Sequence, residues 1–67
     1  MLVEYVASDL SPAALTQAVN FALKAVVRLD VCKEAALKPG QVTLRLYEFP
    51  GEDLAAALEE LGFRIVE

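Results

Sequence analysis

The sequence contains no histidine, and its only methionine is the first residue. Without an imidazole, the chain lacks the side chain whose ordinary pKa best suits general-base catalysis at neutral pH. The sequence also has no glycine-rich phosphate-binding loop, and Ser8 and Ser11 have no base motif around them. These absences leave little on which a catalytic mechanism could depend, and we expect a protein that is not an enzyme.

Cysteine is nearly absent, since Cys32 is the only one among 67 residues, and it cannot form an internal disulfide bond. A soft-metal site needs at least two soft ligands. Cys32 is therefore only a weak candidate for a metal ligand, and the ion would have to be shared between two copies of the chain. Arg28 and Lys33 lie close to it in sequence and could lower its thiol pKa. We expect no cofactor, and we expect self-association to add stability to so small a chain.

Basic residues and long apolar runs are also scarce. Six lysines and arginines stand against ten aspartates and glutamates, which gives a net charge of −4 and disfavours nucleic-acid binding. No stretch approaches the roughly 18 apolar residues of a membrane helix. Residues 1–7 lack the basic start of a secretion signal. We therefore expect a cytoplasmic protein whose partner is neither a nucleic acid nor a membrane.

Hydrophobic residues make up 57% of the chain and recur in short periodic segments. Ser11 and Pro12 suit the N-cap and the first position of a helix, and apolar residues then follow at helical spacing. Strict alternation indicates strands, and Gly62 suits a helix C-terminal cap. The remaining elements predicted in this way are strands over residues 2–7, 41–49 and 63–66 and a helix that begins at residues 52–53.

The end of the first helix is ambiguous. If it ends near Lys24–Ala25, residues 27–31 form a strand, with Arg28, Asp30 and Cys32 directed outward, and residues 33–37 are a connection. If it continues to Lys38, the element order becomes βαβαβ. The β-branched residues at 26, 27 and 31 favour the strand. We therefore predict one α+β domain over residues 1–67: a ferredoxin-like βαββαβ sandwich with two helices on one face of a four-stranded antiparallel sheet.

Several segments resemble a heavy-metal-associated domain of the copper-chaperone type. The resemblance rests on Gln41-Val-Thr-Leu-Arg-Leu46, on Asp53-Leu-Ala-Ala-Ala-Leu-Glu-Glu-Leu-Gly-Phe-Arg-Ile-Val66, on Leu10-Ser11, and on Val19, Ala22 and Leu23. That family binds soft metal ions through Cys-x-x-Cys in its first loop, where this chain has Pro12 and Leu15. The resemblance therefore implies the family's fold without its metal site.

The predicted register places Arg28, Arg45 and Arg64 on the helix-free face of the sheet, together with Tyr47. One interpretation is cross-strand ion pairing, with Glu4 between Arg45 and Arg64 and with Asp30 beside Arg45. The other is an interface or a ligand site. We expect a non-catalytic interaction or oligomerisation module that associates with itself or with another protein through this face. The alternative is a module that binds a metal through Cys32 or a small anion through the three arginines.

Overall fold

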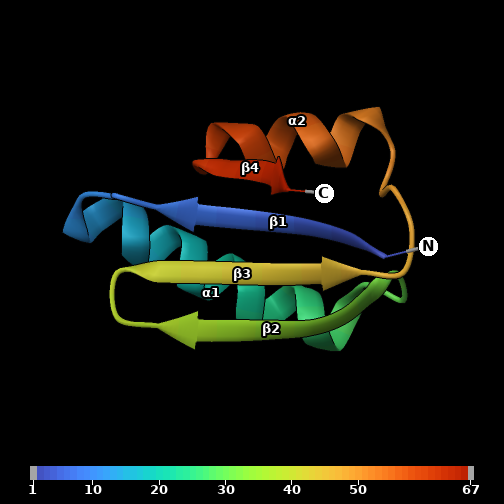
Figure 1. Cartoon of the computed structure of the whole chain (residues 1–67), viewed down its shortest axis with the longest axis horizontal. Coiled ribbons are helices and arrows are strands. Elements are labelled where there is room, and N and C mark those ends of the chain that lie inside the picture. Colours follow the sequence, from blue (N-terminus) through green and yellow to red (C-terminus); the bar gives the residue numbers. More distant parts are fainter. Residues whose placement is uncertain (1, 67) are drawn as a thin grey trace.

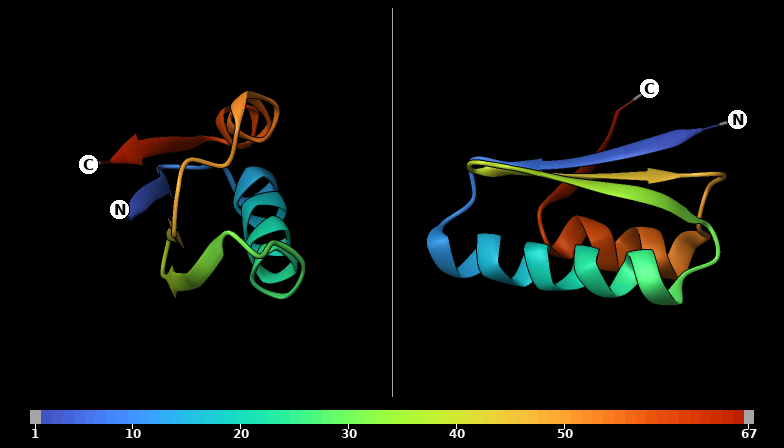
Figure 2. Two further views of the ribbon diagram at one scale, coloured as in Figure 1. Left: turned by 90° about the vertical axis from the view of Figure 1, so that its right-hand side faces the viewer. Right: turned by 90° about the horizontal axis from the view of Figure 1, so that it is seen from below.

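The computed structural model describes residues 2–66 as one antiparallel sheet covered by two helices (Figure 1). The elements in chain order are β1 (Val3–Ser8), α1 (Pro12–Arg28), β2 (Cys32–Lys38), β3 (Gln41–Leu46), α2 (Glu52–Glu60) and β4 (Phe63–Val66). The strands lie side by side in the order β2-β3-β1-β4. Both helices lie on the same side of the sheet (Figure 2). The predicted ferredoxin-like βαββαβ sandwich is therefore confirmed.

Helix α1 begins where the capping residues predict. The Ser11 hydroxyl accepts a hydrogen bond from the Ala14 N–H at 3.2 Å, and Pro12 occupies the first helical position, where a missing N–H costs nothing. The buried residues of α1 are three alanines, Ala18, Ala22 and Ala25. Because alanine has only a methyl group, α1 can lie close against β2 and β3.

The predicted strand over residues 27–31 is wrong. The helix continues through Val27 to Arg28, and Val27 is 83% exposed instead of facing inward. It does not continue to Lys38 either, because Leu29 is its C-cap and the chain turns at residues 30–31. β-branched residues disfavour a helix only weakly, and the buried alanine stripe outweighs that preference.

The second strand is formed by Cys32–Lys38, so the prediction of a connection over residues 33–37 is wrong. Lys38 pairs with Gln41 across a two-residue turn, Pro39-Gly40, in which Gly40 has a positive φ of 73°. Glycine adopts this conformation without strain. The ring of Pro39 presets its own φ at the turn position before Gly40. A two-residue turn joins two paired strands, so the residues on its N-terminal side must be extended.

The core lies between the sheet and the helices. Its largest fully buried side chains are Val42, Leu44, Leu46, Leu58 and Phe63. Phe63 also lies 6.4 Å from Phe21, measured between ring centroids, so an aromatic contact joins β4 to α1. Gly62, with φ 99°, ends α2 and leads directly into β4. The two helices thus pack on the same core from the same side, and the opposite face of the sheet is left without a covering layer.

Candidate functional site

The outer face of the sheet, meaning the face without helices, carries the alternate side chains of all four strands. The register places on it Glu4, Val6, Ser8, Glu34, Ala36, Lys38, Gln41, Thr43, Arg45, Arg64 and Val66. Charged, polar and apolar side chains are mixed on this surface. It is the surface on which we expected an interface or an anion site.

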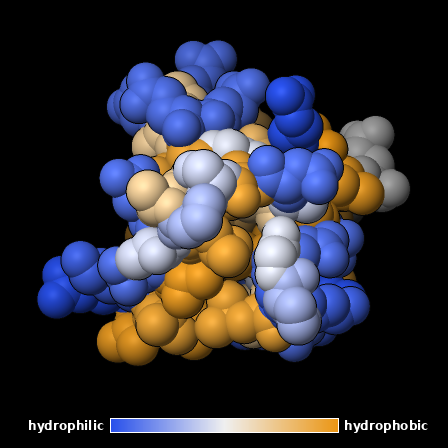
Figure 3. Space-filling view, turned by 90° about the vertical axis from the view of Figure 1, so that its left-hand side faces the viewer, coloured by the Kyte–Doolittle hydropathy of each residue, from blue (hydrophilic) through white to orange (hydrophobic). Residues whose placement is uncertain are grey.

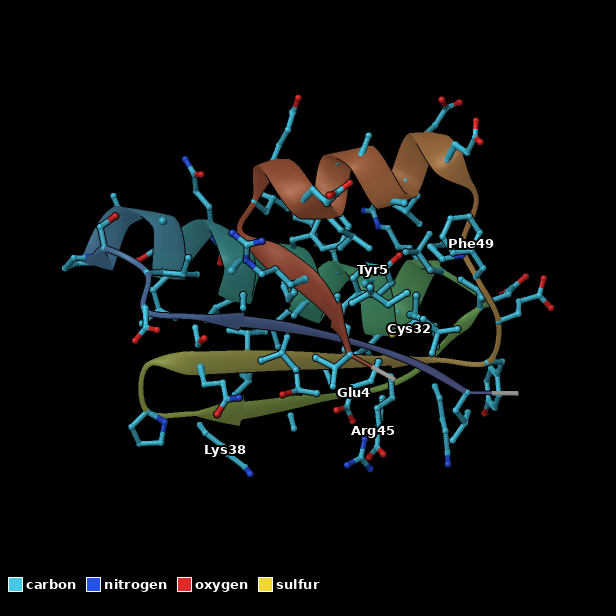
Figure 4. The ribbon with its side chains drawn as sticks, turned by 45° about the horizontal axis from the view of Figure 1, so that its top comes forward. Glu4, Tyr5, Cys32, Lys38, Arg45 and Phe49 are labelled. Carbon is cyan, nitrogen blue, oxygen red and sulfur yellow. The ribbon has the colours of Figure 1, made fainter. Side chains whose placement is uncertain are left out.

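Arg45 is the centre of an ion-pair network on the outer face. Its Nε donates to Glu4 Oε2 at 3.0 Å, and its Nη1 donates to Glu34 Oε1 at 3.0 Å. Figure 4 shows Glu4 and Arg45 together on this side of the sheet. These hydrogen bonds, first that to Glu4 and then that to Glu34, raise the pKa of the Arg45 guanidinium. Arg45 therefore already has two carboxylate partners, as the ion-pair interpretation predicted, although Glu34 takes the place expected for Asp30.

The three arginines do not share one surface. Arg64 lies on the outer face, where it is paired in register with Val6. Arg28 is the last residue of α1, on the helix side of the sheet, and it lines a hollow between the helices with Phe21 and Leu54. Tyr47 lies just beyond β3, and its backbone N–H donates to the Val31 carbonyl at 2.8 Å. The prediction that placed Arg28 beside Arg45 and Arg64 is therefore wrong, because residue 28 is helical.

Cys32 is directed into the core instead of outward. It is paired with Leu46, it is 8% exposed, and its thiol lies 3.8 Å from the Glu34 carbonyl. Burial raises the pKa of the Cys32 thiol, and the contact with the Glu34 carbonyl only partly opposes that effect. Among the described residues no group of three histidine, cysteine or acidic side chains is arranged to hold a metal ion. A protonated thiol in the core is a poor nucleophile and a poor metal ligand.

The buried Cys32 thiol and Tyr5 phenol predict a loss of stability in alkaline solution. Burial raises both pKa values above their ordinary values, and the charge of Glu59 adds to the shift of Tyr5. Above about pH 9 the unfolded chain therefore releases protons that the folded chain retains, and the free energy of unfolding falls as pH rises. Urea unfolding at a series of pH values should show a decreasing midpoint. Cys32→Ala should weaken the decrease near pH 9, and a midpoint that rises through this range would contradict the assignment.

A second exposed surface, with several aliphatic side chains, lies along the free edge of β2 rather than on the outer face. We call it the α1–β2 edge, and it consists of Leu23, Val26 and Val27 of α1 and Leu37 of β2, all exposed. Phe21, on another side of α1, contacts Phe63 and lines a hollow with Leu54 of α2, so this stripe faces away from α2. Figure 3 shows hydrophobic surface gathered over the lower part of the molecule, where α1 and β2 lie.

The backbone of β2 adds unpaired hydrogen-bonding groups to the same edge. β2 is the longest strand and lies at one end of the sheet. Counted from the Lys38–Gln41 pair that closes the turn, the alternation of an antiparallel ladder directs the N–H groups of Ala35 and Leu37 away from β3. A register shift between Cys32 and Glu34 leaves residues 34–38 as the regular part of the strand. Exposed edges of this kind readily pair with another strand.

Sequence reasoning missed the α1–β2 edge because it placed the valines in a strand. A helix through Arg28 puts Leu23 and Val27 one turn apart on an exposed face, outside the buried alanine stripe. The signal that could have found this edge is the surplus of apolar residues in α1, which exceeds what one buried stripe can use.

Comparison of the chain with protein-family models, with curated proteins and with solved structures gave no significant match. Among the described residues, no helix combines the length and the apolar character needed to cross a membrane.

Proposed function

We propose that the protein is a non-catalytic interaction module that forms a homodimer through the α1–β2 edge. The observation that carries the proposal is the coincidence of an unpaired seven-residue strand with exposed aliphatic side chains of the adjacent helix. Apolar side chains that remain in water are stabilised when a second surface covers them. The strand edge makes such a contact specific, because its unpaired backbone groups form regular hydrogen bonds only with another extended segment.

A second copy fits this edge in a two-fold arrangement centred on Ala36. Antiparallel pairing of two β2 strands about this point places Leu37 opposite Ala35 of the second copy, on the helix side. On the outer face it places Glu34 opposite Lys38 of the second copy, so opposite charges meet twice. Opposite charges directly across a strand pair are favourable, and the symmetry repeats each contact. This charge pattern supports a second copy as the occupant.

A dimer interface of standard size would cover a modest share of the surface of this chain. A standard protein–protein interface buries about 800 Å² per partner. The accessible surface of the chain is 4608 Å², so such an interface would use about a sixth of it. Leu23 and Leu37 are each about half exposed, and Val26 and Val27 extend the apolar area along α1. The proposed dimer therefore covers apolar side chains that a monomer leaves in water.

Leu23→Glu is expected to weaken the dimer at least about tenfold, because it buries an unpaired charge at the interface. Tyr47→Glu is the matched control, since Tyr47 is 52% exposed, Leu23 is 53% exposed, and Tyr47 lies beyond the end of β3. Sedimentation equilibrium over a concentration series measures the dimer dissociation constant of each variant. Hydrogen exchange at high protein concentration should also protect the Ala35 and Leu37 amides.

Two results would overturn the proposed dimer. The first is a wild-type protein that sediments as a monomer at every concentration. The second is dissociation by Tyr47→Glu with no effect of Leu23→Glu, which would move the interface to the end of β3. Both variants change exposed side chains, so circular dichroism should show the wild-type helix content in each.

The relation to heavy-metal-associated domains is proposed for the fold alone. The βαββαβ order supports it, and Pro12 and Leu15 lie in the first turn of α1, where neither side chain can donate to a metal ion. Under this proposal the chain keeps that family's scaffold and uses an edge of the sheet for association instead of a loop for metal transfer.

A further inference from the structure

A groove lies on the far side of the molecule from the α1–β2 edge, between α2 and the strands β1 and β4. Its volume is about 360 Å³, within the size range of small-molecule sites. Most of its wall is apolar and is formed by Phe49, Ala55, Ala56 and Ile65. Figure 4 shows Phe49 on the segment that leads into α2 and Tyr5 beneath that helix.

Tyr5 lines this groove and is 2% exposed. Its hydroxyl has no hydrogen-bond partner among residues 2–66. No side-chain oxygen or nitrogen of these residues is both fully sealed and unpaired, so the hydroxyl keeps some accessible surface, and the groove is the hollow that Tyr5 lines. Buried tyrosine hydroxyls usually find a partner, because leaving a desolvated polar group unpaired costs free energy. Tyr5 therefore presents an unused hydrogen-bonding group to whatever occupies the groove.

Among residues 2–66, the charged groups that line the groove are all negative. They are Glu52 and Glu59 of α2, and no basic residue of this range lines it. Glu59 is close enough to Tyr5 for its charge to raise the pKa of the phenol, after the larger effect of burial. Arg64 shares a smaller adjoining hollow with Glu59 but makes no ion pair with it. The Glu59 carboxylate and the Tyr5 hydroxyl oxygen, both hydrogen-bond acceptors, thus line the same partly apolar groove.

We propose that this groove binds a small organic ammonium ion whose hydrocarbon part is an aromatic ring or a short alkyl chain. The ammonium group donates to the Tyr5 hydroxyl and to the Glu59 carboxylate, and the hydrocarbon part lies against Phe49 and Ile65. A carboxylate ligand would be repelled by both glutamates, and a neutral alcohol would leave their charge unbalanced. The net charge of −4 also favours the approach of cations.

The test uses three probes of similar shape: phenethylamine, phenethyl alcohol and phenylacetate. Amide NMR spectra of the wild-type protein, recorded at neutral pH during titration, should show saturable shifts with phenethylamine at Tyr5, Ala55, Ala56 and Ile65. The alcohol should bind more weakly, and phenylacetate should not bind. Added salt should weaken phenethylamine binding, because the ion pair is partly exposed.

Three variants separate the contributions. Tyr5→Phe keeps the ring and removes the hydroxyl, and we expect about a fivefold loss of phenethylamine affinity. Glu59→Gln removes the facing charge, with about a fivefold loss expected. Glu60→Gln is the matched control, because it makes the same charge change on the same helix without touching the groove, and it should leave the affinity near that of the wild type.

The proposal is overturned if phenethylamine causes no saturable shifts, if the alcohol binds equally well, or if Glu60→Gln weakens binding as much as Glu59→Gln. Sedimentation equilibrium of the same samples keeps this result separate from the proposed dimer. The groove lies by β4 and the dimer edge is β2, at opposite ends of the sheet.

Discussion

Replacing Phe63 with alanine is expected to lower the free energy of unfolding by about 3–5 kcal/mol. Phe63 is one of the largest fully buried side chains, and it joins β4 to Phe21 of α1. At about 0.05–0.15 kcal/mol per residue, a chain of 67 residues has only about 3–10 kcal/mol in total. The variant should therefore be largely unfolded at room temperature or close to it.

Urea unfolding followed by circular dichroism measures this loss. Phe63→Leu fills much of the same space, so it should lose clearly less stability than the alanine variant. Phe49→Ala serves as the exposed control, because Phe49 lies outside the buried core, and its loss should be small. A Phe63→Ala protein whose unfolding midpoint matches that of the wild type would show that Phe63 does not hold β4 against the helices.

Replacing Ala22 with leucine is expected to destabilise the fold by about 1–3 kcal/mol through overpacking. Ala22 is fully buried between α1 and the sheet, where the flanking Ala18 and Ala25 also leave room only for methyl groups. A larger side chain must push the helix away from the sheet or adopt a strained rotamer.

The control for this overpacking variant is Val27→Leu on the same helix. In the monomer Val27 points to solvent, so at protein concentrations too low for dimerisation the extra methylene of leucine contacts no neighbouring group, and leucine has the higher helix propensity. Urea midpoints of the two variants should differ clearly, with Val27→Leu near the wild type. Equal midpoints would mean that α1 does not pack on the sheet through its alanines.

The fold was predictable from segments whose periodicity agrees with their tertiary role. Ser11 and Pro12 mark the start of α1, and the alternation of residues 41–46 predicts β3 because one face of that strand is buried. The order βαββαβ followed correctly, although the second strand was placed on the wrong residues. A helix and a half-buried strand both accept residues 27–31, and only the packing of the alanine stripe decides between them.

The candidate site was less predictable than the fold. Arg45 and Glu4 were placed correctly on the outer face because β1 and β3 were in the right register. Arg28 and Cys32 were placed wrongly because their orientation depends on where α1 ends. The groove at Tyr5 depends on how α2 lies over β1 and β4, a tertiary relation that no local pattern encodes. Alternation predicts that Tyr5 is buried, but not that its hydroxyl lacks a partner.

The two edge strands of the sheet differ in length, and this difference would limit how many copies assemble. β2 has seven residues, whereas β4 has four and carries Arg64. Two-fold pairing of β2 with itself uses the same patch on both molecules, and the short β4 strands then form the two outer edges of the joined sheet. A head-to-tail chain would instead have to join β2 to β4, where a short strand offers few backbone groups. Association of this protein would thus stop at two molecules instead of growing into a filament.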